Sequence, residues 1–287
     1  VALLADGQIV DTLATGQTAD LLLAQTPFYA EAGGQVGDTG VITTCQGARF
    51  EVTDTQKPAQ GIILHRGKLV AGTLAKGAAV VATVDEERRA AIRRNHTATH
   101  LLNAALRKVL ANDSLKQAGS YVDAERLRFD FTSFEALTPA QLAAIERQVT
   151  EFVIANRAVK TYEIPLKDVP GSGIIAVFDE KYGDIVRVVE TEGISRELCG
   201  GTHVERSGDI GPFRILAETS IAAGIRRIEA QAGLPACDHT AHEHGILSDL
   251  AHRLSVAPAD LPPRLEALQQ HAHQLEKELK ALAQKNA

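Results

Sequence analysis

The sequence predicts an α+β protein made of a small N-terminal antiparallel β-barrel, a mixed α+β domain and a C-terminal helical hairpin or coiled-coil segment. Three observations predict this fold class. Short apolar runs separated by Gly, Asp and Pro fill the chain to about residue 85. Helical and strand patterns then come in groups rather than in alternation, which favours α+β over a doubly wound sheet. Leucines at spacings of three and four dominate the end of the chain.

The length of 287 residues predicts two or three domains, and we place them at 1–85, 86–234 and 235–287. An apolar share of 45% and a charged share of 23% are typical of soluble globular proteins. No apolar run reaches the roughly 20 residues of a membrane-spanning helix, and the N-terminal end lacks a signal-peptide pattern. Three cysteines, an odd number, argue against a disulfide framework. We therefore expect a cytoplasmic protein with no membrane partner.

The net charge bears on nucleic-acid partners, and the absence of Met bears on whether the sequence is a whole chain. The formal charge of −6 does not indicate a nucleic-acid-binding protein, but a local basic face would be enough to contact phosphates. The chain contains no Met, even at position 1. We interpret this as a sign that the sequence is a piece of a longer chain.

The first 85 residues have the strand spacing of a small barrel or sandwich. Strands are expected at 8–10, 21–24, 40–43, 50–52, 61–65 and 80–84, the last of which would close the barrel. One segment, 26–38, is unusual for a plain barrel because it contains Gly33-Gly34 followed by Gln35. Glycines permit a positive φ or a close approach, so the segment is either a glycine bulge or a loop that presents Gln35 and Thr26 to a ligand.

The next segment, 86–110, has the 3.6-residue period of an amphipathic helix, with Asp85 as its N-cap. His96 and His100 are one turn apart on this helix, within reach of a single ion. A second helix is expected from Thr138, an N-cap followed by Pro139, to about residue 156. Strands are expected around it, in the later part of 112–122 after a turn, at 127–131, 159–164, 185–189, near 198, at 210–218 and at 226–232.

A second pair of metal-ligand residues, Cys199 and His203, encloses Gly200-Gly201-Thr202 on a turn after the strand near residue 198. Imidazole and thiolate are the donors that zinc prefers, and four of them complete a tetrahedron. A metallopeptidase would require Glu directly after the first His, where this sequence has Thr97. The metal could be structural, because four protein ligands close the shell, or catalytic if one ligand is displaceable.

At these residues the sequence resembles the editing region of alanyl-tRNA synthetases and their free-standing relatives, which deacylate mischarged alanine tRNA. The paired metal-ligand motifs are also similar to those of the threonyl-tRNA synthetase editing domain, but Gly33-Gly34-Gln35 favours the alanyl type. The resemblance covers almost the whole chain and is carried by residues 26–38, 95–102, 199–204 and 224–230.

The resemblance implies one Zn²⁺ per chain, held by His96, His100, Cys199 and His203. It also implies hydrolysis of seryl or glycyl esters on the acceptor end of tRNA(Ala). Gln35 and Thr97 are then the expected catalytic and specificity residues, since a hydroxyl is recognised by a site built to hydrogen-bond it. Residues expected to contact substrate or tRNA are Thr26, Gly33, Gly34, Arg226 and Arg227, the two arginines being equally compatible with a solvated strand face.

The sequence lacks an ATP-binding class II aminoacylation core, so we expect this piece to edit tRNA and not to charge it. ATP would be used only by the missing core of a parent alanine-tRNA ligase, which the resemblance implies to be a homodimer. A different class of function also stays open, a non-catalytic tRNA-binding module with a structural zinc.

The final segment predicts two helices. Leucines and an alanine between residues 265 and 282 recur at coiled-coil spacing with Glu and Lys around them. Pro258, Pro262 and Pro263 mark a bend between this helix and an earlier one. We therefore expect a helical hairpin.

Overall fold

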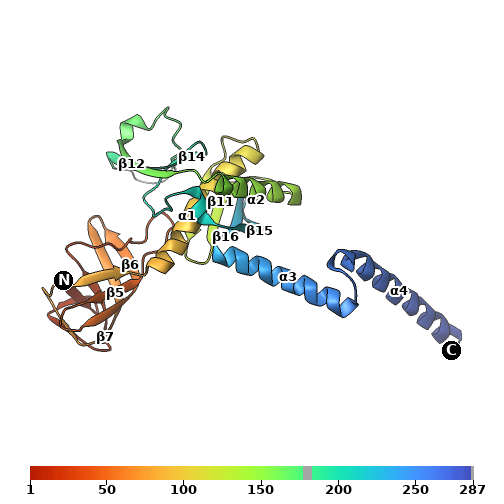
Figure 1. Cartoon of the computed structure of the whole chain (residues 1–287), viewed down its shortest axis with the longest axis horizontal. Helices are drawn as coiled ribbons and strands as arrows, with labels where there is room; N and C mark the ends of the chain where they lie inside the picture. The colour runs from red at the N-terminus through yellow and green to blue at the C-terminus, as the bar shows by residue number, and fades with distance from the viewer. Residues whose placement is uncertain (177–182, 286–287) are drawn as a thin grey trace. The chain divides into compact units, whose positions relative to one another are not determined.

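The computed structural model describes residues 1–176 and 183–285, and these form two compact units, Val1–Ala236 and Cys237–Ala287 (Figure 1). The predicted α+β class is confirmed, since antiparallel sheets and four α-helices account for the described elements. No helix in this part of the chain is long and apolar enough to cross a membrane.

The N-terminal part of the first unit is a seven-stranded antiparallel sheet with the order β2-β1-β4-β7-β6-β5-β9. Its apolar core includes Leu3, Leu21, Phe50 and Leu69, all fully buried. A separate two-stranded ribbon pairs β3 with β8. The strands are β1 (Ala2–Ala5), β2 (Gln8–Val10), β3 (Thr12–Ala14), β4 (Thr18–Leu22), β5 (Gly40–Thr43), β6 (Arg49–Ala59), β7 (Ile62–Ala71), β8 (Thr73–Ala75) and β9 (Val81–Val84).

The predicted β-barrel is wrong, because within the described residues the sheet does not close. Strand β9, which we expected to close it, pairs with β5 alone, and β2 at the other edge pairs with β1 alone. The chain leaves β2 directly for β3, whose partner is β8. Backbone hydrogen bonds from Lys76 to Asp11 and from Gly77 to Val1 occupy groups beside this ribbon. The chain thus passes from one edge strand into a separate ribbon, and no described pairing joins β2 to β9.

The second part of the first unit packs two helices against a four-stranded antiparallel sheet, β10-β11-β16-β15. Helix α1 (Glu86–Val109) begins at Asp85, whose side chain accepts a hydrogen bond from the Arg88 N–H, as predicted. Helix α2 (Pro139–Ile154) begins with a capping box made by Thr138 and Gln141. The strands are β10 (Gln117–Val122), β11 (Leu127–Thr132), β15 (Phe213–Ala222) and β16 (Ile225–Ala232).

A three-stranded antiparallel sheet, β12-β13-β14, completes the first unit and leads into the predicted turn. Its strands are β12 (Val159–Pro165), β13 (Ile185–Thr191) and β14 (Ser195–Leu198). A small apolar cluster that includes Val169, Val186 and Val188 packs beneath it. Because β14 ends at Leu198, Cys199 is the first residue of the loop that follows, as expected.

The segment 26–38 is held against the start of α1 by a buried ion pair between Arg89 and Asp38. Arg88 also donates to the carbonyl of Gly37 at 2.8 Å, and the backbone N–H of Val36 donates to Val122 on β10 at 3.1 Å. A buried pair is costly to break, since it leaves one unpaired charge. These contacts place Gln35 beside α1.

The buried His65 on β7 is expected to make the stability of the first sheet dependent on pH. Its Nδ1 donates to the carbonyl of Leu21 at 2.9 Å, so its Nε2 accepts from the hydroxyl of Thr26 at 2.6 Å. Burial lowers the pKa of His65, and the hydrogen bond to Leu21 opposes this shift only in part. The folded protein therefore disfavours the protonated imidazole, and protonation favours the unfolded chain.

We expect the free energy of unfolding to fall as pH drops below about 6.5, the unfolded-state value for His. The slope attributable to His65 is at most about 1.4 kcal/mol per pH unit and acts down to the folded-state pKa. Urea unfolding at several pH values between 7.5 and 5 should show a shallower dependence in His65→Gln than in the parent. His271→Gln, on exposed helix surface, is the control. Parallel curves for His65→Gln and the parent would contradict the assignment.

The second compact unit contains most of α3 (Leu234–Leu254) and all of α4 (Leu261–Lys285), joined by a bend at Pro258–Asp260. The two predicted helices and the bend between them are therefore present. The expected packing into a hairpin is not seen, because none of the described residues of α4 is buried. Leu275 and Leu279, for example, are 45% and 66% exposed. The leucine stripe predicts the helix correctly but not what covers it.

Candidate metal centre

Four side chains able to hold a metal converge where α1 meets the loop after β14. They are the four predicted from the sequence: His96, His100, Cys199 and His203. Their candidate ligand atoms all lie within 4.8 Å of one another. The two His on α1 are 6% and 7% exposed, so the cluster lies at the buried face of the helix.

Two of the distances among these atoms match the edges of a tetrahedral metal site. The Cys199 Sγ lies 3.4 Å from Nε2 of His96 and 3.3 Å from Nε2 of His203. Zinc–nitrogen and zinc–sulfur bonds of about 2.0–2.3 Å imply edges of about 3.3–3.6 Å between ligands of a tetrahedron. The Nε2 of His100 is buried and has no hydrogen-bond partner among the described residues. An unsatisfied buried nitrogen facing a thiol is the donor that an ion would use.

Each of the three imidazoles is oriented through its other nitrogen. The amide oxygen of Gln35 accepts from Nδ1 of His96 at 2.6 Å, and the carboxylate of Glu197 accepts from Nδ1 of His100 at 2.8 Å. The hydroxyl of Thr97 lies 3.2 Å from Nδ1 of His203. An imidazole that donates through Nδ1 is left with a lone pair on Nε2. The three Nε2 atoms are thus prepared as ligands.

The hydroxyl of Thr97 is an acceptor toward His203 because its own proton is already used. It donates to the carbonyl of Arg93 at 2.9 Å, one turn earlier on α1. The same oxygen accepts from the backbone N–H of Val204 at 3.2 Å. Thr97 therefore connects α1 to the loop that carries Cys199 and His203.

The electrostatics of the cluster favour a thiolate and at least one neutral imidazole. Burial raises the pKa of the Cys199 thiol, but the nearby imidazoles, His96 first among them, outweigh burial and lower this pKa well below its ordinary value. Burial and the nearby His96 lower the pKa of His203 to about 3. Thiolate and neutral imidazole are the forms that bind a metal ion.

His100 differs from His203 because an acidic side chain faces it. Burial lowers its pKa, but the charges of Glu197 and Cys199 raise it more, so that the net pKa lies well above its ordinary value. The acidic surroundings therefore favour a proton on His100 when no cation is bound. A bound cation would displace that proton.

The loop between Cys199 and His203 is held from two sides. Arg187 on β13 donates to the carbonyls of Cys199 at 2.9 Å and of Gly201 at 2.7 Å. On the other side the backbone N–H of Thr202 donates to the amide oxygen of Gln35 at 2.9 Å. Gln35 thus contacts both the imidazole of His96 and the loop that carries Cys199 and His203.

A cavity of about 150 Å³, which we call the metal cavity, opens beside the cluster. This is smaller than the roughly 300–1,000 Å³ of typical small-molecule sites, so it admits only a small group. It is lined by two of the imidazoles, the thiol and several polar side chains. The lining residues are Tyr29, Ala32, Gly33, His96, Thr99, His100, Gln117, Ser120, Glu197, Leu198, Cys199, Gly200 and Gly201.

The remaining residues predicted for the site lie at different distances from this cavity. Gly33 lines it, whereas Gly34 passes so close to the backbone of Ser120 that a side chain would overlap it. Gln35 and Thr97 are not among the described lining residues and contact the imidazoles from behind. The hydroxyl of Thr26 is hydrogen-bonded to His65.

Arg226 and Arg227, predicted for nucleotide contacts, are both paired with carboxylates. Arg226 pairs with Glu218 on the neighbouring strand β15, including a contact of 2.6 Å. Arg227 pairs with Asp130 on β11 through bonds of 2.7 and 2.8 Å. A phosphate at either position would have to compete with these carboxylates.

Sequence reasoning missed several residues of the site, among them Glu197 and Arg187. Glu197 stands two residues before Cys199, on a strand whose neighbours Ser195 and Leu198 are buried. The sequence did show an acid close to the metal motif, but only the structure shows that this acid is buried. Arg187 offered no such signal, because its contacts depend on how β13 pairs with β14.

Comparisons with known proteins agree with this geometry. Residues 1–88 match the family model described as tRNA synthetases class II (A). Residues 186–229, which contain Cys199 and His203, match the model of the threonyl and alanyl tRNA synthetase second additional domain. An alanine–tRNA ligase of Methylococcus capsulatus is 48% identical over 288 residues, covering 100% of this chain and 33% of the relative. The chain belongs to the alanine–tRNA ligase family.

Other members of this family align equally well. The alanine–tRNA ligase of Desulfosudis oleivorans is 45% identical over 282 residues, 98% of this chain and 32% of the relative. The chloroplastic/mitochondrial enzyme of Ostreococcus lucimarinus is 45% identical over 271 residues, 94% of this chain and 30% of the relative. The chain thus spans about a third of the length of the curated relatives it matches.

Proposed function

We propose that this part of an alanine–tRNA ligase hydrolyses the ester of tRNA(Ala) mischarged with serine or glycine, with one zinc ion held by His96, His100, Cys199 and His203. The observation that carries the proposal is the small metal cavity beside the cluster. A volume of about 150 Å³ suits a small aminoacyl group and not a large one. The family adds the tRNA, since its members are ligases for alanine and tRNA by name.

The residues of the chain have distinct parts in this proposal. Gln35, Glu197 and Thr97 keep the three imidazoles oriented so that Nε2 of each faces the ion. Zinc, when bound, supplies Lewis-acid polarisation of the ester or of a water. Polar side chains in the cavity wall, those of Gln117, Ser120 and Glu197, are available to hydrogen-bond the amino acid and the attacking water.

This arrangement changes the roles that we expect for Gln35 and Thr97. Each has its oxygen engaged with an imidazole, at 2.6 and 3.2 Å respectively. They therefore act as positioning residues, and contact with the serine hydroxyl falls to groups that line the cavity. A site that offers a partner to a hydroxyl retains serine more strongly than alanine, which is the discrimination that editing needs.

A second candidate function is a tRNA-binding module whose zinc is structural. The observation that favours it is that four protein side chains are available to close the tetrahedron. In this case the ion stabilises the junction of α1 and the loop after β14 but contacts no substrate.

A deacylation assay separates the two candidates. Zinc-loaded protein incubated with Ser-tRNA(Ala) should release serine well above the rate in buffer, and Ala-tRNA(Ala) serves as the matched substrate that should be spared. Binding of tRNA without release of serine would favour the structural ion. Release of serine at the buffer rate, at protein concentrations that saturate the tRNA, would refute the hydrolase.

A further inference from the structure

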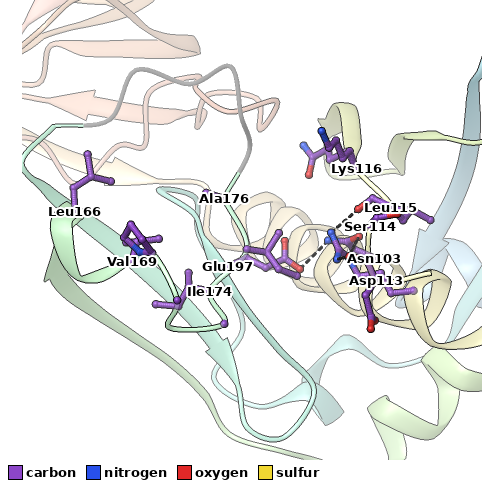
Figure 2. A pocket seen from close by; sticks show the side chains of 16 residues that line it. Asn103, Asp113, Ser114, Leu115, Lys116, Leu166, Val169, Ile174, Ala176 and Glu197 are labelled. Carbon is purple, nitrogen blue, oxygen red and sulfur yellow. Dashed lines mark hydrogen bonds between the residues drawn. The ribbon is translucent and has the colours of Figure 1, made fainter. Parts of the chain in front are cut away.

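The carboxylate of Glu197, which supports His100 from behind, is itself held by a second side chain, that of Asn103. One carboxylate oxygen accepts from Nδ1 of His100 at 2.8 Å, and the other accepts from the side-chain amide of Asn103 at 3.1 Å. Figure 2 shows Asn103 and Glu197 pointing toward one another from α1 and β14. Among the described residues, these two bonds are the ones that fix the carboxylate. Both oxygens of Glu197 are thus engaged.

Burial makes each of these two bonds hard to replace. Asn103 is 1% exposed and Glu197 is 5% exposed, so little water reaches either side chain. A buried carboxylate oxygen that loses its donor carries the cost of desolvation without compensation. Without a donor at position 103, the carboxylate would turn toward another donor and would take its second oxygen away from His100. Asn103 therefore controls a hydrogen bond in which it takes no part.

The orientation of the Asn103 amide follows from the chemistry of its two neighbours. The Nε of Arg107, one turn further along α1, lies 3.4 Å from the amide oxygen. A guanidinium can only donate and an ionised carboxylate can only accept, so the amide oxygen faces Arg107 and the amide nitrogen faces Glu197. Arg107 is anchored in turn, because it donates to the carbonyls of Asp113 and Leu115, both at 2.5 Å. The amide of Asn103 is thus held in the orientation that donates to Glu197.

The other two imidazoles of the cluster are supported by uncharged acceptors that are anchored differently. Gln35 is fixed by the loop that carries two of the candidate ligands, and Thr97 is fixed by its own helix. Of the three imidazoles, His100 is the one that depends on a carboxylate, and this carboxylate comes from another element. The position of that carboxylate depends on Asn103.

We propose that Asn103 is a positioning residue of the metal centre, which acts through Glu197 to hold Nε2 of His100 toward the ion. This inference rests on the proposed function, because it takes the cluster to be a zinc site. His100, Asn103 and Arg107 are spaced by three and four residues, so they share one face of α1. Loss of an outer partner of this kind costs about 10–100-fold in metal affinity. We expect the loss of the Asn103 donor to fall in that range.

The test measures the zinc dissociation constant by competition with a chromogenic chelator. Asn103→Asp keeps the size of the side chain but places a second carboxylate opposite Glu197, and it should weaken zinc binding about tenfold or more. Asn103→Leu removes the donor without adding a charge and should also weaken zinc binding about tenfold. Asn112→Asp is the matched control, because the described bonds of Asn112 to Ser114 use the side-chain oxygen, which aspartate retains. Its dissociation constant should stay within about twofold of the parent.

Exchanging the donor and the acceptor separates positioning from packing. When Asn103→Asp is combined with Glu197→Gln, the amide oxygen at position 197 can still accept from His100, and the amide nitrogen can donate to the carboxylate at position 103. The double variant should therefore bind zinc about tenfold more tightly than Asn103→Asp alone. Visible absorption of the cobalt-substituted proteins gives a second readout, since its bands depend on the geometry of the ligands. The bands should change in Asn103→Asp and return toward those of the parent in the double variant.

Parent-like zinc affinity in both single variants at position 103 would overturn the inference, and so would a double variant that binds zinc no better than Asn103→Asp. Urea unfolding of the metal-free proteins shows whether Asn103→Asp still folds, and Asn103→Leu decides if it does not. If the affinities change as expected but the zinc-loaded parent releases no serine from Ser-tRNA(Ala), the proposed hydrolysis fails and the positioning role stands. If the parent releases serine and zinc affinity is unchanged in the single variants, the positioning role fails alone.

Discussion

Replacing Cys199 with alanine is expected to abolish zinc binding and serine release together. The thiolate is the one anionic donor of the cluster, and its sulfur lies 3.4 and 3.3 Å from the ligand nitrogens of His96 and His203. Loss of a residue that only orients a ligand costs about 10–100-fold in metal affinity, so loss of the ligand itself should cost at least about 100-fold. Metal content by mass spectrometry and release of serine from Ser-tRNA(Ala) provide the two measurements.

The chain supplies matched controls for this substitution. Cys45 and Cys237 are exposed free cysteines, and alanine at either should leave zinc content and deacylation unchanged. Cys199→Ser keeps the size of the side chain and tests whether thiolate chemistry is required rather than packing. A Cys199→Ala protein that keeps zinc and full activity would show that the cluster is not the metal site. One that loses zinc but still releases serine would make the ion structural.

The helices of the first unit were predictable because their ends are specified locally. Asp85 and Thr138 each cap a helix with a side chain that bonds to a backbone N–H three residues later. The predicted start of α1 is correct, and its last residue, Val109, is one short of the prediction. Such signals need only neighbouring residues, so no knowledge of tertiary structure is required.

The predicted β-barrel was wrong because closure of a sheet depends on residues that are far apart in the sequence. Whether a sheet closes depends on pairing between strands at its two edges, which alternation within a strand does not reveal. Strands β3 and β8 are three residues each, too short to give an alternating pattern, yet their pairing diverts the chain from closure. The leucine pattern of α4 is limited in the same way, since it predicts an apolar helix face but not the surface that packs against this face.

The convergence of the four candidate metal ligands was predictable because two pairs at spacings of four residues bring their side chains together within one helical turn or one short loop. The glycines before Gln35 drew attention to this residue, but its contact with His96 joins residues 61 positions apart in the sequence and was not predicted. Glu197 was missed because its partner His100 is distant in the chain. Sequence alone thus identified the four candidate donors, and the hydrogen bonds that orient them required the fold.

Gly201→Ala is expected to weaken zinc binding about 10–100-fold, the range found when support of a ligand imidazole is lost. A Cβ at position 201 would overlap the imidazole of His96 and would lie 2.8 Å from the amide oxygen of Gln35. His96 cannot move aside freely, because its Nδ1 is bonded to that same oxygen. The methyl group must therefore displace the ligand or separate it from Gln35.

Gly200→Ala provides the matched control within the same motif. A Cβ at position 200 meets nothing within 4 Å, so zinc affinity should stay within about twofold of the parent, the effect of a typical surface substitution. Competition with a chromogenic chelator gives the zinc dissociation constant of both variants. Urea unfolding of the metal-free proteins separates a loss of affinity from a loss of stability.

The comparison also distinguishes two reasons for having glycine in this loop. Neither Gly200 nor Gly201 has a positive φ among the described residues, so the left-handed backbone that favours glycine is not needed at either position. If backbone freedom of the loop were the requirement, both alanine variants should weaken zinc binding to a similar degree. If the close approach of His96 is the requirement, only Gly201→Ala should weaken zinc binding. Equal dissociation constants for the two variants would contradict the packing of His96 against Gly201.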